Sequence, residues 1–114
     1  MDRLRAAIEK RGMTVLARID HAAAATQVCL TLRPTEVVIF GNPRAGTPLM
    51  QVAQTMGIDL PLKILVWQDG EDKTWLSTND PKWLAKRHGV DAGTERVADA
   101  MTAALAAVMT EATH

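Results

Sequence analysis

The chain has 114 residues, of which 47% are hydrophobic and 23% charged, and this composition predicts one compact domain, residues 1–114, that is stable without metals or disulfides. Thirteen basic residues balance thirteen acidic ones, so no net charge draws the chain to nucleic acid or to an anionic membrane. The sequence has no apolar run long enough to span a membrane and no signal peptide, and its single cysteine is compatible with a reducing compartment. We therefore expect a soluble, cytoplasmic protein with no nucleic-acid or membrane partner.

Apolar periodicity and turn residues predict, in chain order, helix, strand, short helix, strand, helix, a two-stranded hairpin and two helices. The predicted ranges are 2–11, 13–20, 21–30, 36–41, 47–57, 62–68, 73–77, 81–88 and 94–112. Asp20 is expected to cap the third element, and Thr47 to cap the fifth with Pro48 at its first position. The nearly continuous apolar run of 62–68 predicts a strand covered on both faces.

The order of these elements shows no regular strand–helix alternation, and the hairpin requires an antiparallel pair. Both features predict an α+β fold or a mixed α/β sandwich and exclude a doubly wound nucleotide fold. The hairpin register leaves open whether Trp67 and Trp75 lie on the same face of the sheet. The last helix carries a repeating apolar face, which favours packing against a sheet or a partner helix.

The stretch FGNPRAGTP places Gly41 and Gly46 at the spacing of a nucleotide phosphate loop. Thr47 stands where that loop requires lysine, and Pro48 stands where it requires a metal-binding hydroxyl, so the sequence argues against an NTPase. Two interpretations remain open. In one, the helix that begins at Thr47 offers free N–H groups to an anion beside Arg44. In the other, the stretch is only a turn and a helix cap.

The sequence gives little support for a metal or cofactor site. The spacing of Asp20, His21 and Cys29 matches no known metal or haem ligand pattern. His88 is expected in the last turn of a short helix, where a cation suits the helix dipole, and His114 is the terminus. We therefore expect no metal site, and the cofactor is unknown. Cys29 lies in an Ala-rich segment and is expected to be buried and inert. The carboxylates of residues 69–72 are expected to be a solvated hairpin tip, because their spacing is not that of an EF-hand loop.

Several separate motifs resemble one family, the bacterial and archaeal domain of unknown function 302. They are ARIDH at 17–21, RPT at 33–35, FGNP at 40–43, GTPLM at 46–50, DLPLK at 59–63, Trp67 and NDP at 79–81. The resemblance implies an α+β fold with a curved, mainly antiparallel sheet of four or five strands packed by helices, similar to the TATA-binding-protein layout, and a homodimer. Members begin with a strand before the first helix, so the resemblance also implies that this strand is absent here or that Met1 is not the native start.

These motifs cluster at turns and strand ends, and the sequence predicts that they meet in one cleft. We expect this cleft to bind a small anionic ligand. The expected ligand residues are Asn42, Arg44, Gly46, Thr47, Asp59 and Lys63.

Two other functions stay open. One is an enzyme in which His21, oriented by Asp20, acts as general base. The other is a structural or regulatory interaction module.

Overall fold

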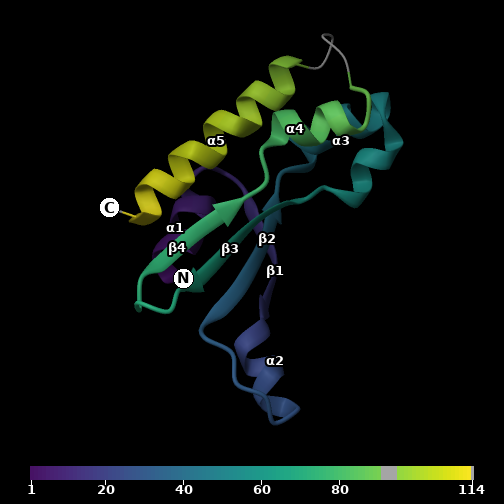
Figure 1. Cartoon of the computed structure of the whole chain (residues 1–114). Helices are drawn as coiled ribbons and strands as arrows, with labels where there is room; N and C mark the ends of the chain where they lie inside the picture. The colour runs from purple at the N-terminus through teal and green to yellow at the C-terminus, as the bar shows by residue number, and fades with distance from the viewer. Residues whose placement is uncertain (91–94, 114) are drawn as a thin grey trace.

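The computed structural model describes residues 1–90 and 95–113 (Figure 1). Its elements are α1 (Asp2–Lys10), β1 (Thr14–Asp20), α2 (His21–Gln27), β2 (Thr35–Gly41), α3 (Pro43–Val52), the 3₁₀ helix η1 (Gln54–Ile58), β3 (Leu62–Gln68), β4 (Thr74–Thr78), α4 (Pro81–Arg87) and α5 (Glu95–Thr113). The predicted elements are therefore present, although several of their bounds differ. Thr94, the predicted start of the last helix, and His114 lie outside the described residues.

The strands form one sheet in the order β1-β2-β3-β4, and every neighbouring pair is antiparallel. This confirms the α+β fold and rules out the mixed α/β alternative. Alternate residues of the two central strands, including Val38, Phe40 and Ile64, are fully buried beneath the helices. Helices α1 and α5 lie side by side along this face, while α3, η1 and α4 gather at one end of the sheet (Figure 1).

The long helix α5 packs through the predicted apolar stripe. Met101, Leu105 and Val108 are buried in the core. Near its C-terminal end, Glu111 forms ion pairs with Lys10 and Arg11 at the end of α1. These contacts place α5 across the helical layer, against α1 at one end and α4 at the other.

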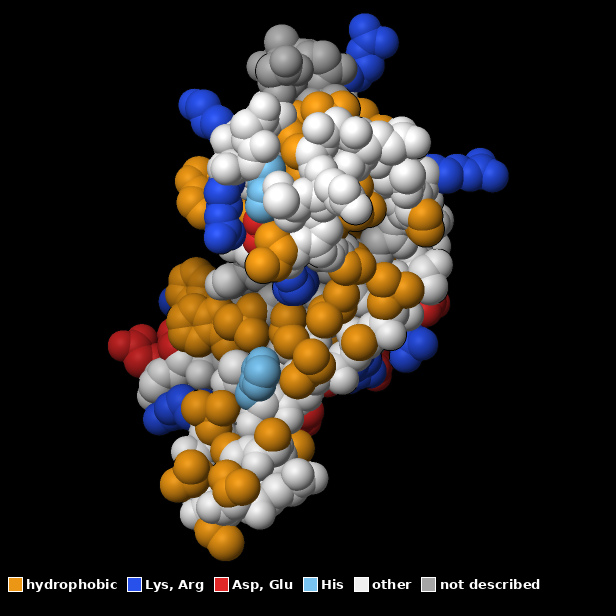
Figure 2. All heavy atoms as spheres, turned by 90° about the vertical axis from the view of Figure 1, so that its right-hand side faces the viewer, with side chains coloured by type: hydrophobic (Ala, Val, Ile, Leu, Met, Phe, Trp, Pro, Cys, Tyr) orange, Lys and Arg blue, Asp and Glu red, His pale blue; other side chains and the backbone are white. Residues whose placement is uncertain are grey.

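The opposite face of the sheet, here called the outer face, is also rich in apolar side chains. The strand register places on it Ala17, Ile19, Thr35, Val37, Ile39, Lys63, Leu65, Trp67, Trp75 and Ser77. The side chains of Ile19 and Trp75 remain 42% and 47% exposed, and apolar side chains form a band across the middle of this side of the molecule (Figure 2). The prediction that residues 62–68 are covered on both faces is met only in part: no residue of β3 is exposed, but its outward side chains are half-buried and not fully covered.

Trp67 and Trp75 lie directly opposite each other on the outer face, and their rings stack with centroids 6.3 Å apart. The Trp75 indole N–H donates to Asp69 Oδ2, at 2.8 Å. Asp69 Oδ1 accepts the backbone N–H groups of Glu71 and Lys73. The predicted solvated hairpin tip is thus wrong for Asp69, whose carboxylate holds the turn together.

Two local predictions around α2 and α3 are also wrong. Cys29 is exposed, and its backbone adopts a left-handed conformation with φ of 61° just past the end of α2. Helix α3 begins at Pro43 rather than after Thr47, so Pro48 lies inside the helix. The sequence contains two cap-and-proline pairs, and the first of them, Asn42-Pro43, starts the helix.

Candidate functional site

The backbone N–H groups in the first turn of α3 are already hydrogen-bonded within the turn. Pro43 has no N–H, and the Arg44 N–H donates to the Asn42 side-chain oxygen at 3.0 Å. The N–H groups of Ala45 and Gly46 both donate to the Asn42 carbonyl. With these donors occupied, the helix start does not offer the free N–H groups that an anion requires. The turn-and-cap interpretation of this stretch is therefore favoured.

The other predicted ligand residues of this stretch, Arg44, Gly46 and Thr47, do not lie in a common environment. Gly46 is buried inside α3, where a Cβ atom would lie 3.5 Å from Leu60 Cδ1. Arg44 and Thr47 are exposed on the helix. Among the described residues, no hydrogen bond or ion pair connects the 42–47 segment to Asp59 or Lys63. The six predicted ligand residues are thus not gathered by direct contacts into one site.

A different group of polar side chains surrounds Asp59, just after η1. His88, the residue that ends α4, places its Nε2 2.5 Å from Asp59 Oδ2, and its Nδ1 lies 2.9 Å from the Thr55 hydroxyl. Arg87 reaches both oxygens of Asp59 at 3.3 Å. The His88 and Asp59 side chains are 9% and 14% exposed, whereas Arg87 is half exposed. With Lys63, which acts on Asp59 through its charge, these residues form what we call the Asp59 cluster.

The electrostatics of the Asp59 cluster keep the carboxylate ionised. The hydrogen bond from His88 holds the pKa of Asp59 below its usual range, against the opposing effect of burial. The charges of Arg87 and Lys63 lower this pKa further. Two fixed cations facing one carboxylate leave the cluster with a net positive charge, even when His88 is neutral. The cluster is therefore suited to a small anion or to proton transfer through the imidazole.

Sequence reasoning identified part of this cluster. It placed Asp59 and Lys63 in one site, and in the structure the charge of Lys63 acts on Asp59, although no hydrogen bond or ion pair among the described residues joins the two side chains. It missed Thr55, Arg87 and His88, which it treated as ordinary helical residues. The pair Arg87-His88 at the end of a helix was the only sequence signal, and its partner Asp59 lies 29 residues earlier along the chain.

The alternative pair, Asp20 and His21, is arranged differently from the prediction. Asp20 Oδ1 accepts the Ala23 N–H at 2.9 Å and so caps α2, as expected. Among the described interactions, none joins the Asp20 carboxylate to the His21 ring, and His21 is exposed at the start of α2. This arrangement gives His21 no visible orienting partner.

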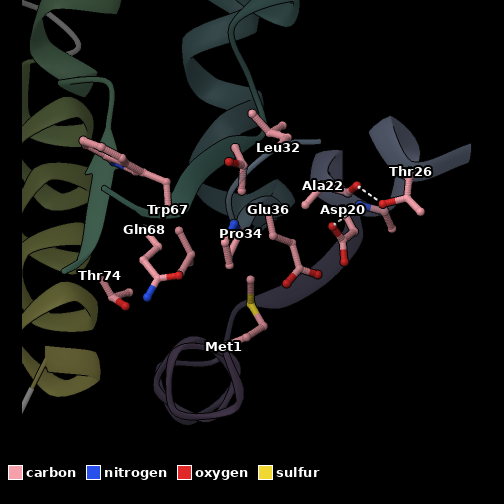
Figure 3. Close-up of a pocket in the computed structure, with 13 residues that line it drawn as sticks. Met1, Asp20, Ala22, Thr26, Leu32, Pro34, Glu36, Trp67, Gln68 and Thr74 are labelled. Carbon is pink, nitrogen blue, oxygen red and sulfur yellow. Dashed lines mark hydrogen bonds between the residues drawn. The ribbon is translucent and has the colours of Figure 1, made fainter. Parts of the chain in front are cut away.

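A separate cavity of about 600 Å³ opens between α2, the start of β2 and the end of β3 (Figure 3). Its walls combine apolar groups with the carboxylates of Asp20 and Glu36. Glu36 is paired with Arg18, at 3.2 and 3.3 Å, and this pairing raises the pKa of the Arg18 guanidinium. An acidic lining disfavours an anion, so the cavity does not replace the Asp59 cluster as the candidate anion site.

None of the helices in the described parts of the chain is long and apolar enough to cross a membrane.

The chain is similar to two curated proteins from Brucella. It is 46% identical over 101 residues to the fluoride-specific ion channel FluC 1 of Brucella suis biovar 1 (strain 1330) and to FluC 1 of Brucella abortus biovar 1 (strain 9-941). Each match covers 89% of this chain but only 40% and 37% of those proteins. The chain therefore spans about two fifths of the length of these relatives.

The fold is similar to the crystal structure of an uncharacterized conserved protein, DUF302, from Bacillus stearothermophilus, with a TM-score of 0.87. That match covers 97% of this chain and 86% of the other, at 20% sequence identity, so it shows the fold alone. The sequence model of the family described as domain of unknown function DUF302 matches residues 1–108. The resemblance seen in the sequence is thereby confirmed, and the chain belongs to the DUF302 family.

Proposed function

We propose that this DUF302 domain binds a small anion at the Asp59 cluster. The observation that carries the proposal is the ion pair of Arg87 with one nearly buried carboxylate, on which the charge of Lys63 also acts; together the two cations leave an excess positive charge beside the His88 ring. The half-exposed guanidinium of Arg87 has donors left over for a ligand, because only one of its nitrogens contacts Asp59. The ligand is thus a small anion, as expected from the sequence, but its site is the Asp59 cluster and not the 42–47 segment.

The Brucella relatives suggest which anion to test first. In those chains a region 46% identical to this one belongs to a protein named as a fluoride-specific ion channel. A domain joined to a channel is exposed to the ion that the channel carries. Fluoride is a compact anion that accepts hydrogen bonds from guanidinium and ammonium groups, so we propose it as the first candidate ligand.

A thermal-shift series tests the anion site. The melting temperature is measured with fluoride, chloride, phosphate, sulfate and acetate at constant ionic strength. At ten times its Kd, a bound anion stabilises the folded state by about 1.4 kcal/mol, which raises the melting temperature by about 5 °C for a domain of this size. We expect Arg87→Gln and Lys63→Gln to lose this shift.

Arg44→Gln is the matched control, because Arg44 is an exposed cation on α3 that lies in the originally predicted site. It should keep the full shift. An anion shift that survives both Arg87→Gln and Lys63→Gln, or one that disappears in Arg44→Gln, would contradict the Asp59 cluster as the site.

We also propose that the domain works as a homodimer and that the outer face binds a second copy. Strands about 4.8 Å apart that rise about 3.3 Å per residue give each outward side chain about 32 Å², so the ten residues of this face cover about 300 Å². A stable interface needs about 800 Å² from each partner, commonly with a smaller apolar core inside a polar rim. The outer face fits such a core, and the exposed Val28, Leu30 and Leu32 beyond α2 extend the apolar surface.

Charge also favours a second copy as the partner. Lys63 is the one charged residue among the ten that define the outer face, and the whole chain has a formal net charge of zero. Two copies therefore meet with little electrostatic repulsion. A cytoplasmic location remains part of the proposal, since the exposed thiol of Cys29 stays reduced there.

A further inference from the structure

Thr55, His88 and Asp59 form a continuous chain of hydrogen bonds inside the Asp59 cluster. The Thr55 hydroxyl lies 2.9 Å from His88 Nδ1, and His88 Nε2 lies 2.5 Å from Asp59 Oδ2. Thr55 lies in η1, Asp59 directly follows η1, and His88 directly follows α4. The fold therefore aligns a hydroxyl, an imidazole and a carboxylate that are distant in sequence.

The state of Asp59 determines where the protons lie in this chain. An ionised carboxylate can only accept a hydrogen bond, so the proton between the two side chains belongs to His88 Nε2. In the neutral ring Nδ1 then carries a lone pair, and it must accept the hydrogen bond from the Thr55 hydroxyl. This is the protonation pattern that makes an imidazole a general base for a hydroxyl nucleophile, with the two ring nitrogens exchanged relative to the serine protease arrangement.

Exposure supports a chemical role for this arrangement. The imidazole is 9% exposed and thus shielded from water, whereas Thr55 is an exposed residue of η1. The residue that carries the hydroxyl is therefore on the surface, where a small molecule can reach it, while the base beside it is largely shielded from water.

We propose that Thr55 is a nucleophile for acyl transfer from small activated esters, with His88 as its general base. Thr55 Oγ forms a bond to the acyl carbon while the hydroxyl proton moves to His88 Nδ1. The bond from the acyl carbon to the departing oxygen breaks, and that oxygen takes the proton from Nδ1. Water then attacks the acyl carbon of the threonine ester, and the proton of the water passes through Nδ1 to Thr55 Oγ as the ester bond breaks. Overall, one ester and one water become one acid and one alcohol.

The test uses p-nitrophenyl acetate, a neutral ester, with the full chain in a Cys29→Ser background. The background removes the exposed thiol of Cys29, which would react with the ester by itself. Release of p-nitrophenol is followed by absorbance, and the acetyl group is located by peptide mass spectrometry. We expect the acetyl group on Thr55, its loss in Thr55→Ala, and its return in Thr55→Ser. His88→Gln should slow acetylation by about 100-fold or more.

Thr47→Ala is the matched control, because Thr47 is an exposed threonine on α3. It should react like the parent protein. Acetylation that is unchanged in Thr55→Ala, that is found only on lysines, or that is equally fast in a folded His88→Gln variant overturns the proposal. Thr55→Ala keeps the test decisive if His88→Gln does not fold, since Thr55 is exposed and its truncation leaves no buried cavity.

Nucleophilic reactivity of Thr55 does not depend on anion binding, although both concern the Asp59 cluster. The neutral ester carries no charge for Arg87 or Lys63 to bind. Acetylation of Thr55 in a protein without any anion-induced thermal shift supports the nucleophile and removes the proposed anion site. An anion shift without acetylation of Thr55 supports the anion site and removes the nucleophile.

Discussion

At the scale of single residues, Asp59 is the group on which the proposed anion site and the proposed nucleophile both depend. It accepts hydrogen bonds from His88 and Arg87, and these partners, together with Lys63, hold its pKa below the usual range. Its carboxylate fixes the tautomer of His88 and also neutralises part of the positive charge of Arg87 and Lys63. One nearly buried carboxylate thus prepares the imidazole for a hydroxyl and sets the charge available to a ligand.

Acidification should reveal the contribution of Asp59 to stability. A carboxylate with a lowered folded-state pKa contributes fully above its unfolded value of about 4, and its contribution is lost as the pH falls through the folded-state value. The Trp75 N–H and backbone donors lower the pKa of Asp69 in the same direction. We therefore expect the free energy of unfolding to fall below about pH 4, and we expect Asp59→Asn to flatten part of that fall.

Urea unfolding between pH 7 and pH 2, followed by tryptophan fluorescence, measures this effect. Asp69→Asn serves as the comparison. It should remove the contribution of Asp69 to the fall in unfolding free energy at low pH and leave the contribution of Asp59 unchanged. An acid slope in Asp59→Asn that equals that of the unmodified chain would mean that the carboxylate is not stabilised by its neighbours in solution.

At the scale of elements, the start of α3 shows how two equivalent signals compete. Asn42-Pro43 and Thr47-Pro48 each have a capping side chain followed by a proline suited to the first helical position. The structure uses the first pair, because β2 ends at Gly41 and the chain can turn directly into the helix. The Asn42 side chain and carbonyl then satisfy the N–H groups of the first turn.

Substitution of the two candidate caps separates these alternatives. Asn42→Ala should lower the stability of the domain by about 1 kcal/mol because it leaves a helix donor without its cap, a loss of about 4 °C in melting temperature. Thr47→Ala, in the interior of the helix, should change stability by less than about 0.5 kcal/mol. Thermal melts followed by circular dichroism provide the measurement, and a larger loss in Thr47→Ala would show that the helix begins later.

At the scale of the whole molecule, the sheet has two apolar faces and the helices bury only one of them. The outer face keeps Ile19 and Trp75 about half exposed beside the stacked Trp67. An apolar patch of this size is often a contact surface, and the balanced charge of this chain does not oppose association. The proposed homodimer is thus a property of the fold as a whole rather than of any one motif.

Light scattering at micromolar concentration tests the dimer. The native chain should have twice the 12.4 kDa mass of one copy. Ile19→Lys places a charge in the outer face and should yield a folded monomer, because burying an unpaired ammonium is costly. Val52→Lys introduces the same charge at an exposed apolar residue at the end of α3 and should leave the dimer intact. A monomeric native chain, or a dimer that tolerates Ile19→Lys, would argue against this surface.

Much of the secondary structure was predictable from sequence because its signals are local. Asp20 caps α2 as expected, Asp80-Pro81 starts α4, and the apolar stripe of α5 faces the core. The errors arose where local signals were ambiguous. Two cap-and-proline pairs competed for the start of α3, and the apolar composition of β3 did not distinguish a strand buried on both faces from one whose outward side is half-buried.

The sequence by itself determined the family, the α+β class and most of the helices and strands, since periodicity, caps and turns act over a few residues. It also placed Asp59 and Lys63 in one site. Only the tertiary structure brought His88 to Asp59 and Thr55, because the packing of α4 against the end of the sheet closes a separation of 29 and 33 residues. Antiparallel pairing across four strands likewise decided that the apolar side chains share one outer face, because register is a relation between strands and not a property of any one of them.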